Sequence, residues 1–141
     1  MTATLACGAV GTLTAGKINV GENDGLTFTV YGTDGTLKFD LMEMDWLYFY
    51  DSHADGGTFG GMHGFIKIEC VGRYPQPGGG FPSPKAPNGW LRGHVGSMYS
   101  YLSAVCEGVE ACPSFTDGAR VQVILDAAHR SHQSGNAVKI P

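Results

Sequence analysis

Residues 26–50 read LTFTVYGTDGTLKFDLMEMDWLYFY, and this stretch decides the fold. In residues 26–31 apolar side chains alternate with threonine and tyrosine, a period of two that is typical of a β-strand with two different faces. The pair Asp34-Gly35 is suited to the positive φ angles of a tight turn, so residues 31–36 predict a hairpin. Residues 46–50 carry large side chains on both faces and predict a strand that is covered on both sides.

Further strands are predicted on either side of this stretch. Residues 2–7 and 10–18 flank a Gly8-Ala9 turn, and residues 65–71 and 137–140 supply two more extended segments. The segment between residues 72 and 89 contains five of the seven prolines of the chain, which indicates an ordered crossing loop or a flexible link.

Two helices are predicted after this loop. The first covers residues 94–107 and ends at Gly108, and the second begins near Thr116 or Asp117 and ends at Gly135. Their apolar stripes consist of Val95, Met98, Leu102 and Val105 in the first helix, and Val121, Ile124, Leu125 and Ala128 in the second. The sequence therefore predicts a single α+β domain over residues 1–141, with a mostly antiparallel open sheet and helices on one face.

The other face of the sheet has no predicted cover. Trp46, Tyr48 and Tyr50 alternate onto this face, and a large exposed apolar face usually marks a partner surface. We therefore expect a homodimer or higher oligomer through the sheet face, or docking on a missing domain.

Composition excludes several classes of partner. The chain has 43% hydrophobic residues, enough for a core, only 16% charged residues and a net charge of −4, which argues against binding nucleic acid or a membrane surface. No stretch approaches the length of a transmembrane helix. The four cysteines show no CxxC spacing, so we expect reduced and mostly buried thiols in a cytoplasmic protein.

Two motifs resemble ligand sites without completing them. Residues 11–18 match a phosphate-binding loop except for Ile18, where Ser or Thr would hold magnesium, and the residues that follow are turn-like. His129 and His132 have a spacing that can place two metal ligands on one helix face, but Asp126, Arg130 and Gln133 lie nearby and indicate a solvated polar face, so we expect no metal site. His53 and His63 lie in a glycine-rich stretch; metal or substrate contact is the alternative, and we interpret them as exposed loop residues.

The best candidate for ligand binding is the segment that leads into the first helix. Trp90 offers a flat indole for stacking on a sugar ring, Arg92 a rigid fork of donors, and His94 a side chain that titrates near neutrality. In the alternative interpretation, Trp90 packs at the helix entry, Arg92 is a surface charge and His94 begins the helix. No catalytic triad and no GxGxxG fingerprint occurs, so no catalytic or cofactor-binding residue is assigned.

Three stretches together resemble one family, and they cover nearly the whole chain. They are residues 8–39, with the segment VYGTDGTL, residues 94–108, and residues 113–140, which combine a P-x-F-x-DG turn, a helix and S-x-x-SG. This order is similar to the C-terminal domain of the glucose–fructose oxidoreductase, inositol dehydrogenase and rhizopine-catabolism (Gfo/Idh/MocA) family.

The resemblance implies nicotinamide-dependent oxidation or reduction of sugars or polyols. In this family a Rossmann domain binds NAD(P), a lysine in an EKP motif assists hydride transfer, and an Asp-x-x-x-His pair is the acid/base element. The sequence contains no Rossmann fingerprint, Lys85 stands in a different context, and no Asp-x-x-x-His occurs. We therefore expect this chain alone to bind no cofactor and to be catalytically incomplete.

Two hypotheses follow. In the first, the chain is the substrate-binding and oligomerisation portion of an NAD(P)-dependent sugar or polyol oxidoreductase, a fragment or split subunit that needs a Rossmann-domain partner. In the second, it is a non-catalytic module for binding or assembly through its sheet.

Overall fold

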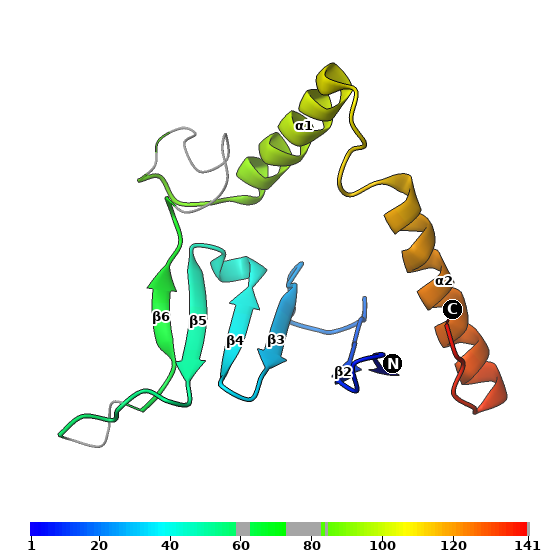
Figure 1. Cartoon of the computed structure of the whole chain (residues 1–141), viewed down its shortest axis with the longest axis horizontal. Helices are drawn as coiled ribbons and strands as arrows, with labels where there is room; N and C mark the ends of the chain where they lie inside the picture. Colours follow the sequence, from blue (N-terminus) through cyan, green and yellow to red (C-terminus); the bar gives the residue numbers. More distant parts are fainter. Residues whose placement is uncertain (59–62, 73–82, 84, 141) are drawn as a thin grey trace.

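The computed structural model describes residues 1–58, 63–72, 83 and 85–140. The strands are β1 (Thr2–Thr4), β2 (Val10–Thr12), β3 (Thr27–Tyr31), β4 (Gly35–Asp40), β5 (Trp46–Asp51) and β6 (Ile66–Glu69). A short 3-10 helix, η1 (Leu41–Glu43), lies between β4 and β5, and the two α-helices are α1 (Trp90–Glu107) and α2 (Phe115–Ser134) (Figure 1). The predicted α+β class is confirmed.

Strands β3, β4, β5 and β6 form a four-stranded antiparallel sheet in that order, and β1 and β2 form a separate two-stranded hairpin. Val30 pairs with Leu37, Leu37 with Phe49 and Phe49 with Ile66, so these side chains lie on one face. We call this the apolar face; its members are Phe28, Val30, Leu37, Phe39, Leu47, Phe49, Ile66 and Ile68. The opposite, aromatic face carries Tyr31, Trp46, Tyr48 and Tyr50 together with Lys38 and Lys67.

The hairpin between β3 and β4 forms where it was predicted, but Gly35 has another role. Gly35 already belongs to β4, pairs with Asp51 and is not among the glycines with positive φ. A Cβ atom at this position would lie 2.2 Å from the carbonyl oxygen of Tyr50. The prediction of a positive φ at Gly35 is therefore wrong, because the close approach of β5 is what requires the glycine.

Replacement of Gly35 by alanine is expected to disrupt the sheet. The new methyl group would collide with backbone, and we expect a loss of roughly 2 kcal/mol or more in the free energy of unfolding. Urea denaturation measures this loss. Gly96→Ala is the matched control, because its Cβ meets nothing within 4 Å and alanine favours the helix; equal stability of the two variants would contradict the packing argument.

The helix ends follow local signals in the sequence. Gly108 and Gly135 both adopt the left-handed conformation, with φ of 68°, and terminate α1 and α2 as predicted. Ser114 caps α2 in a capping box with Asp117. Residues 137–140 contain no strand, so the predicted closing strand is wrong; an extended segment becomes a strand only beside a neighbour, and none of the described strands pairs with it.

The helices extend beyond the sheet. They were expected on one face, but Figure 1 shows α1 leaving one end of the four-stranded sheet and α2 lying to its side. Among the described residues, Ala104 and Ala127 are the buried apolar side chains, so the expectation of a core within the chain is wrong. Three of the four cysteines, Cys7, Cys106 and Cys112, are exposed for the same reason, contrary to the prediction of mostly buried thiols.

The accessible surface measures this lack of packing. The chain exposes 11594 Å², whereas a compact monomer of this mass exposes about 7,000 Å². No helix in the described part of the chain is both long and apolar enough to cross a membrane.

Candidate functional site

Arg92 is the buried charged residue at the start of α1, with 8% of its surface exposed. Its Nη1 donates to the carbonyl oxygens of Val71 (3.3 Å) and Ala86 (3.2 Å) and to Asn88 Oδ1. Its Nη2 donates to the carbonyl oxygen of Ser83 (2.9 Å). The guanidinium thus joins the end of the β6 segment, the crossing loop and α1.

This placement corrects the view of Arg92 as a surface charge. A guanidinium has five N–H donors in a fixed plane and can serve several carbonyl groups at once. In the described residues it orders the loop that precedes Trp90, so Arg92 acts as a positioning residue. Its contact with a substrate stays a prediction.

Trp90 and His94 lie within α1, because the helix begins at Trp90 and not at His94 as predicted. The indole and imidazole rings meet edge to face, with centroids 5.3 Å apart. Trp90 is 70% exposed and His94 is also exposed. The structure thus brings two of the three predicted side chains together at the surface of the first helical turn.

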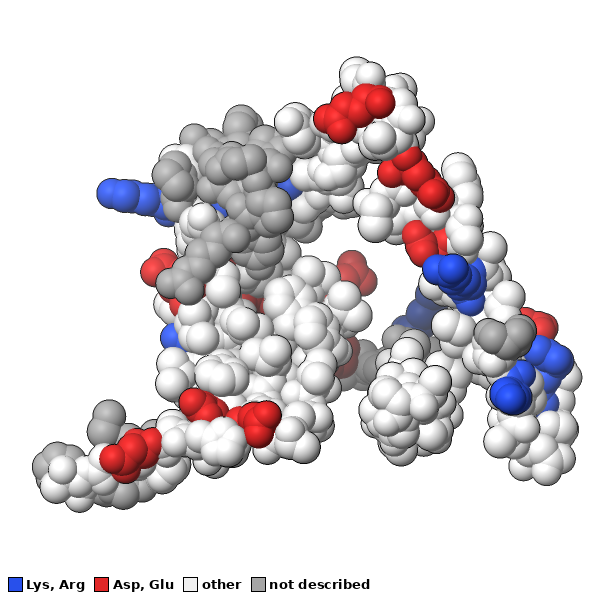
Figure 2. Space-filling model, viewed as in Figure 1, with Lys and Arg blue, Asp and Glu red and all other residues white. Residues whose placement is uncertain are grey.

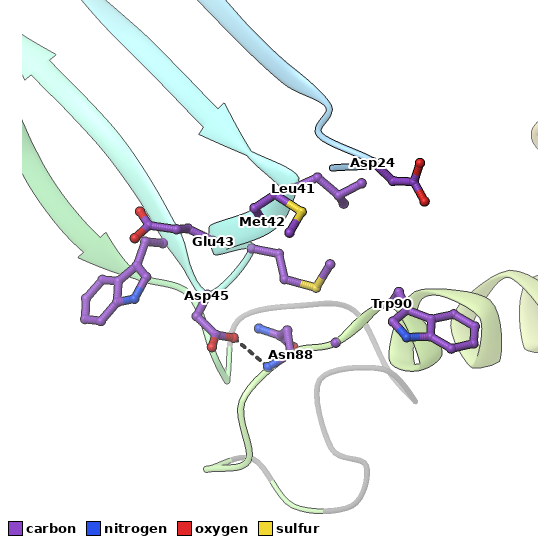
Figure 3. A pocket seen from close by; sticks show the side chains of 10 residues that line it. Asp24, Leu41, Met42, Glu43, Asp45, Asn88 and Trp90 are labelled. Atoms are coloured by element: carbon purple, nitrogen blue, oxygen red, sulfur yellow. Dashed lines mark hydrogen bonds between the residues drawn. The ribbon is translucent and has the colours of Figure 1, made fainter. Parts of the chain in front are cut away.

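A cavity of about 720 Å³ separates this turn from the end of the sheet. Figure 3 shows the residues around it: Trp90 projects from the start of α1, Leu41 and Met42 come from η1, and Asp45 points toward Asn88. The remaining lining residues are Asp24, Glu43, Met44, Trp46 and Gly89. These groups suit a polyhydroxylated ligand. Carboxylates accept hydrogen bonds from hydroxyl groups, and indoles offer flat faces for stacking on a ring.

Asn88 connects the two sides of the cavity. Its backbone N–H donates to Asp45 Oδ1, and its side-chain oxygen accepts from Arg92. Its Nδ2 is buried and has no hydrogen-bond partner in the described part of the chain. The hydrogen bonding between sheet and α1 is therefore incomplete within these residues, since a buried donor normally has an acceptor.

The aromatic face carries an ionic cluster next to the cavity. Tyr48 Oη donates to Glu43 Oε2, and Lys67 Nζ lies 3.4 Å from the same oxygen and 4.8 Å from the centre of the Trp46 ring. The Tyr48 hydroxyl, followed by Lys67, lowers the pKa of Glu43. Hydrogen bonding to Tyr48 is the main cause that raises the pKa of Lys67. The cluster is partly exposed and holds η1 against β5 and β6 without burying charge.

The pH dependence of this cluster follows from these directions. Since the pKa of Glu43 is lowered in the folded state, its stabilising contribution is present above its ordinary value of 4.5 and is lost as the pH falls through the folded value. We expect a ¹³C NMR titration of the Glu43 carboxyl to show a midpoint below 4.5, and Tyr48→Phe to move it upward. Tyr50→Phe, on the same face, is the control; an unchanged midpoint in Tyr48→Phe would refute the assigned cause.

The other sequence candidates lie apart from this site. His53 forms an exposed pair with Asp34 at 3.0 Å. His129 and His132 are exposed on α2, and no group of three or more metal-ligating side chains occurs in the described ranges. After β2, residues 19–25 contain no helix, as predicted from their turn-like sequence. The strand predicted over residues 10–18 is shorter than expected, because β2 ends at Thr12.

Sequence reasoning missed Asp45 and Glu43 as members of the site, and it placed Asn88 in the candidate segment before α1 without assigning it a role. Asp45 and Asn88 are 43 positions apart, and neither belongs to a recognisable motif. Asp45 lies immediately before β5, and this position at the end of a strand was the available signal.

Comparison with known proteins agrees with this architecture. Residues 1–140 match the model of the Gfo/Idh/MocA oxidoreductase family, C-terminal alpha/beta domain. The chain belongs to this family. A relative within the family, levoglucosan dehydrogenase from Pseudarthrobacter phenanthrenivorans, is 30% identical over 138 residues, which cover 96% of this chain and 34% of that protein.

Two solved structures of oxidoreductases resemble the chain over 99% of its length. One is an oxidoreductase domain protein from Kribbella flavida, with a TM-score of 0.84 and 30% identity, of which the chain covers 36%. The other is levoglucosan dehydrogenase in complex with NADH and levoglucosan, with a TM-score of 0.87 and 27% identity, of which it covers 37%. The chain thus spans about a third of the length of the relatives that it matches.

Proposed function

We propose that this chain is the substrate-binding and oligomerisation portion of an NAD(P)-dependent sugar or polyol oxidoreductase. The observation that carries the proposal is the family match over residues 1–140. The related levoglucosan dehydrogenase, solved with NADH and levoglucosan, supports a nicotinamide cofactor and a sugar-type substrate for the complete enzyme.

The residues of this chain would contribute binding and not hydride transfer. Trp90 would stack on a ring of the substrate, His94 would hydrogen-bond to a hydroxyl, and Arg92 would hold the loop that positions both. Hydride transfer requires the reacting carbon of the substrate to lie within contact distance of the nicotinamide. The residues that bind the nicotinamide would come from a Rossmann domain.

A hybrid enzyme tests the proposal. In the levoglucosan dehydrogenase of P. phenanthrenivorans, the matched stretch is replaced by residues 1–140 of this chain; we call this protein the hybrid dehydrogenase. We expect the hybrid dehydrogenase to reduce NAD⁺ or NADP⁺ with at least one substrate from a panel of anhydrosugars, hexoses and inositols. A folded hybrid that binds cofactor but oxidises none of them would contradict the proposal.

Self-association through the aromatic face is the second part of the proposal. Tyr and Trp are enriched in protein interfaces, and this face offers Trp46, Tyr48 and Tyr50 together with charges of both signs, which a two-fold interface can pair.

Light scattering of the purified chain tests this association. We expect a dimer or larger oligomer, and we expect Tyr50→Asp to dissociate it, whereas Arg130→Ala on α2 does not. A monomer at high concentration would contradict self-association. A stable oligomer whose hybrid lacks all activity would instead favour the alternative function, a non-catalytic assembly module in the cytoplasm.

A further inference from the structure

The two α-helices of the chain begin in different ways. Helix α2 has its own cap, because Ser114 accepts from the backbone N–H of Asp117 and the Asp117 side chain accepts in return from the N–H of Ser114. The N-cap residue of α1 is Gly89, which has no side chain to serve as a cap, and the first turn of α1 contains no acidic residue. The sequence of α1 therefore does not by itself fix where this helix begins.

Asp45 holds the start of α1 from the sheet. Its Oδ1 accepts a hydrogen bond from the backbone N–H of Asn88, the residue before Gly89 (Figure 3). Its backbone carbonyl oxygen accepts from the N–H of Cys70, directly after β6, at 2.8 Å. Asp45 itself lies directly before β5, so one residue joins two strands to the segment that enters the helix.

Arg92 closes these hydrogen bonds into a ring. Its Nη1 donates to the carbonyl oxygen of Val71, the neighbour of Cys70, and to Asn88 Oδ1. Since Cys70 and Asn88 are both bonded to Asp45, the connection runs from the sheet to α1 and back without a break. Hydrogen bonds in such a network support one another, so the ring fixes the first turn of α1 relative to the end of β5.

The surroundings of Asp45 explain why its side chain keeps one direction. Figure 2 shows the middle of the sheet without a charged side chain, and the charges lie at its rim. Asp45 is half-buried at an end of the sheet, and the apolar side chains of Leu41, Met42 and Met44 line the same cavity. A carboxylate in such surroundings is costly unless it accepts hydrogen bonds, so the bond from the Asn88 N–H orients it.

We infer that Asp45 is a positioning residue for substrate binding, which fixes the first turn of α1 and with it the indole of Trp90 against the cavity. The inference rests on the proposed function, because it takes the cavity as the place of a sugar ring. Asn88 is two positions before Trp90, so a shift of its backbone moves the indole. Stacking requires a defined distance and tilt between rings, so a helix start that moves binds the same ligand less tightly.

Steady-state kinetics of the hybrid dehydrogenase test the inference. We expect Asp45→Ala to raise KM for the sugar about 10-fold and to change kcat by less than about twofold, because binding is weakened and the reacting groups are left in place. Asp45→Asn keeps an acceptor oxygen, so its KM should lie within about threefold of that of the unaltered hybrid. Asp51→Ala is the matched control, since Asp51 ends the same strand and accepts from the backbone N–H of His53 at 2.9 Å.

A double variant shows whether Asp45 acts through Trp90. In a hybrid that carries Trp90→Ala, the additional change Asp45→Ala should lower kcat/KM by less than about twofold, because the indole that it positions is already absent. Full additivity of the two changes would overturn the inference. Equal KM values for Asp45→Ala and Asp51→Ala would also overturn it, as would a loss in Asp45→Ala that falls on kcat alone.

Hydrogen exchange separates this inference from the proposed function. In the hybrid with bound cofactor, Asp45→Ala should accelerate exchange of the Asn88 backbone amide at least about 10-fold, and Asp51→Ala should not. A hybrid that binds cofactor but oxidises no sugar would contradict the proposed function, and unchanged exchange at Asn88 would overturn the inference in either case. Loss of cofactor binding in Asp45→Ala would overturn it as well, because Asp45 would then support the whole fold and not the helix start.

Discussion

Replacement of Arg92 by alanine is expected to release the crossing loop from α1. The change leaves the carbonyl groups of Val71, Ser83 and Ala86 and the side chain of Asn88 without their donor. Loss of a buried donor that serves several acceptors costs about 3–5 kcal/mol. We therefore expect hydrogen exchange of the backbone amides in residues 85–92 to accelerate at least about 100-fold.

Two further variants define the role of Arg92. Lysine keeps the charge but not the planar fork, so Arg92→Lys should recover only part of the protection. Arg130→Ala is the matched control, because the pair of Arg130 with Asp126 is exposed and such pairs contribute about 0.5 kcal/mol. Full protection in Arg92→Lys would show that charge alone holds the loop.

Replacement of Trp90 by alanine in the hybrid dehydrogenase is expected to lower kcat/KM by about 10- to 100-fold. Trp90 lines the cavity and is 70% exposed in the isolated chain, so its removal should cost little stability and act on substrate binding. Steady-state kinetics at saturating cofactor measure the effect. Tyr101→Ala, an exposed aromatic residue farther along α1, is the control; an equal decrease in both variants would assign the effect to the helix and not to the indole.

Local features of the fold could be predicted from the sequence. The alternation in residues 26–31 and the glycines that end both helices depend on interactions within a few positions, and the structure confirms them. The family resemblance was equally accessible, because its three stretches span most of the chain.

Features that depend on distant contacts could not be predicted. Gly35 is required by the carbonyl group of Tyr50 on a neighbouring strand, and Arg92 is buried by acceptors up to 21 positions away. The prediction of a core within the chain was wrong for a related reason. A high content of apolar residues indicates that apolar surface becomes buried, but it does not show which polypeptide buries it. The strand expected at residues 137–140 has no neighbour among the described strands.

The most direct test is a measurement of turnover by the purified 141-residue chain, supplied with NAD⁺ or NADP⁺ and the same panel of anhydrosugars, hexoses and inositols. We predict no formation of reduced cofactor by the chain alone, and formation once its residues 1–140 are joined to the remaining two thirds of the related dehydrogenase. Turnover by the isolated chain would contradict the account, because it would mean that these residues can themselves hold a hydride acceptor against a substrate carbon.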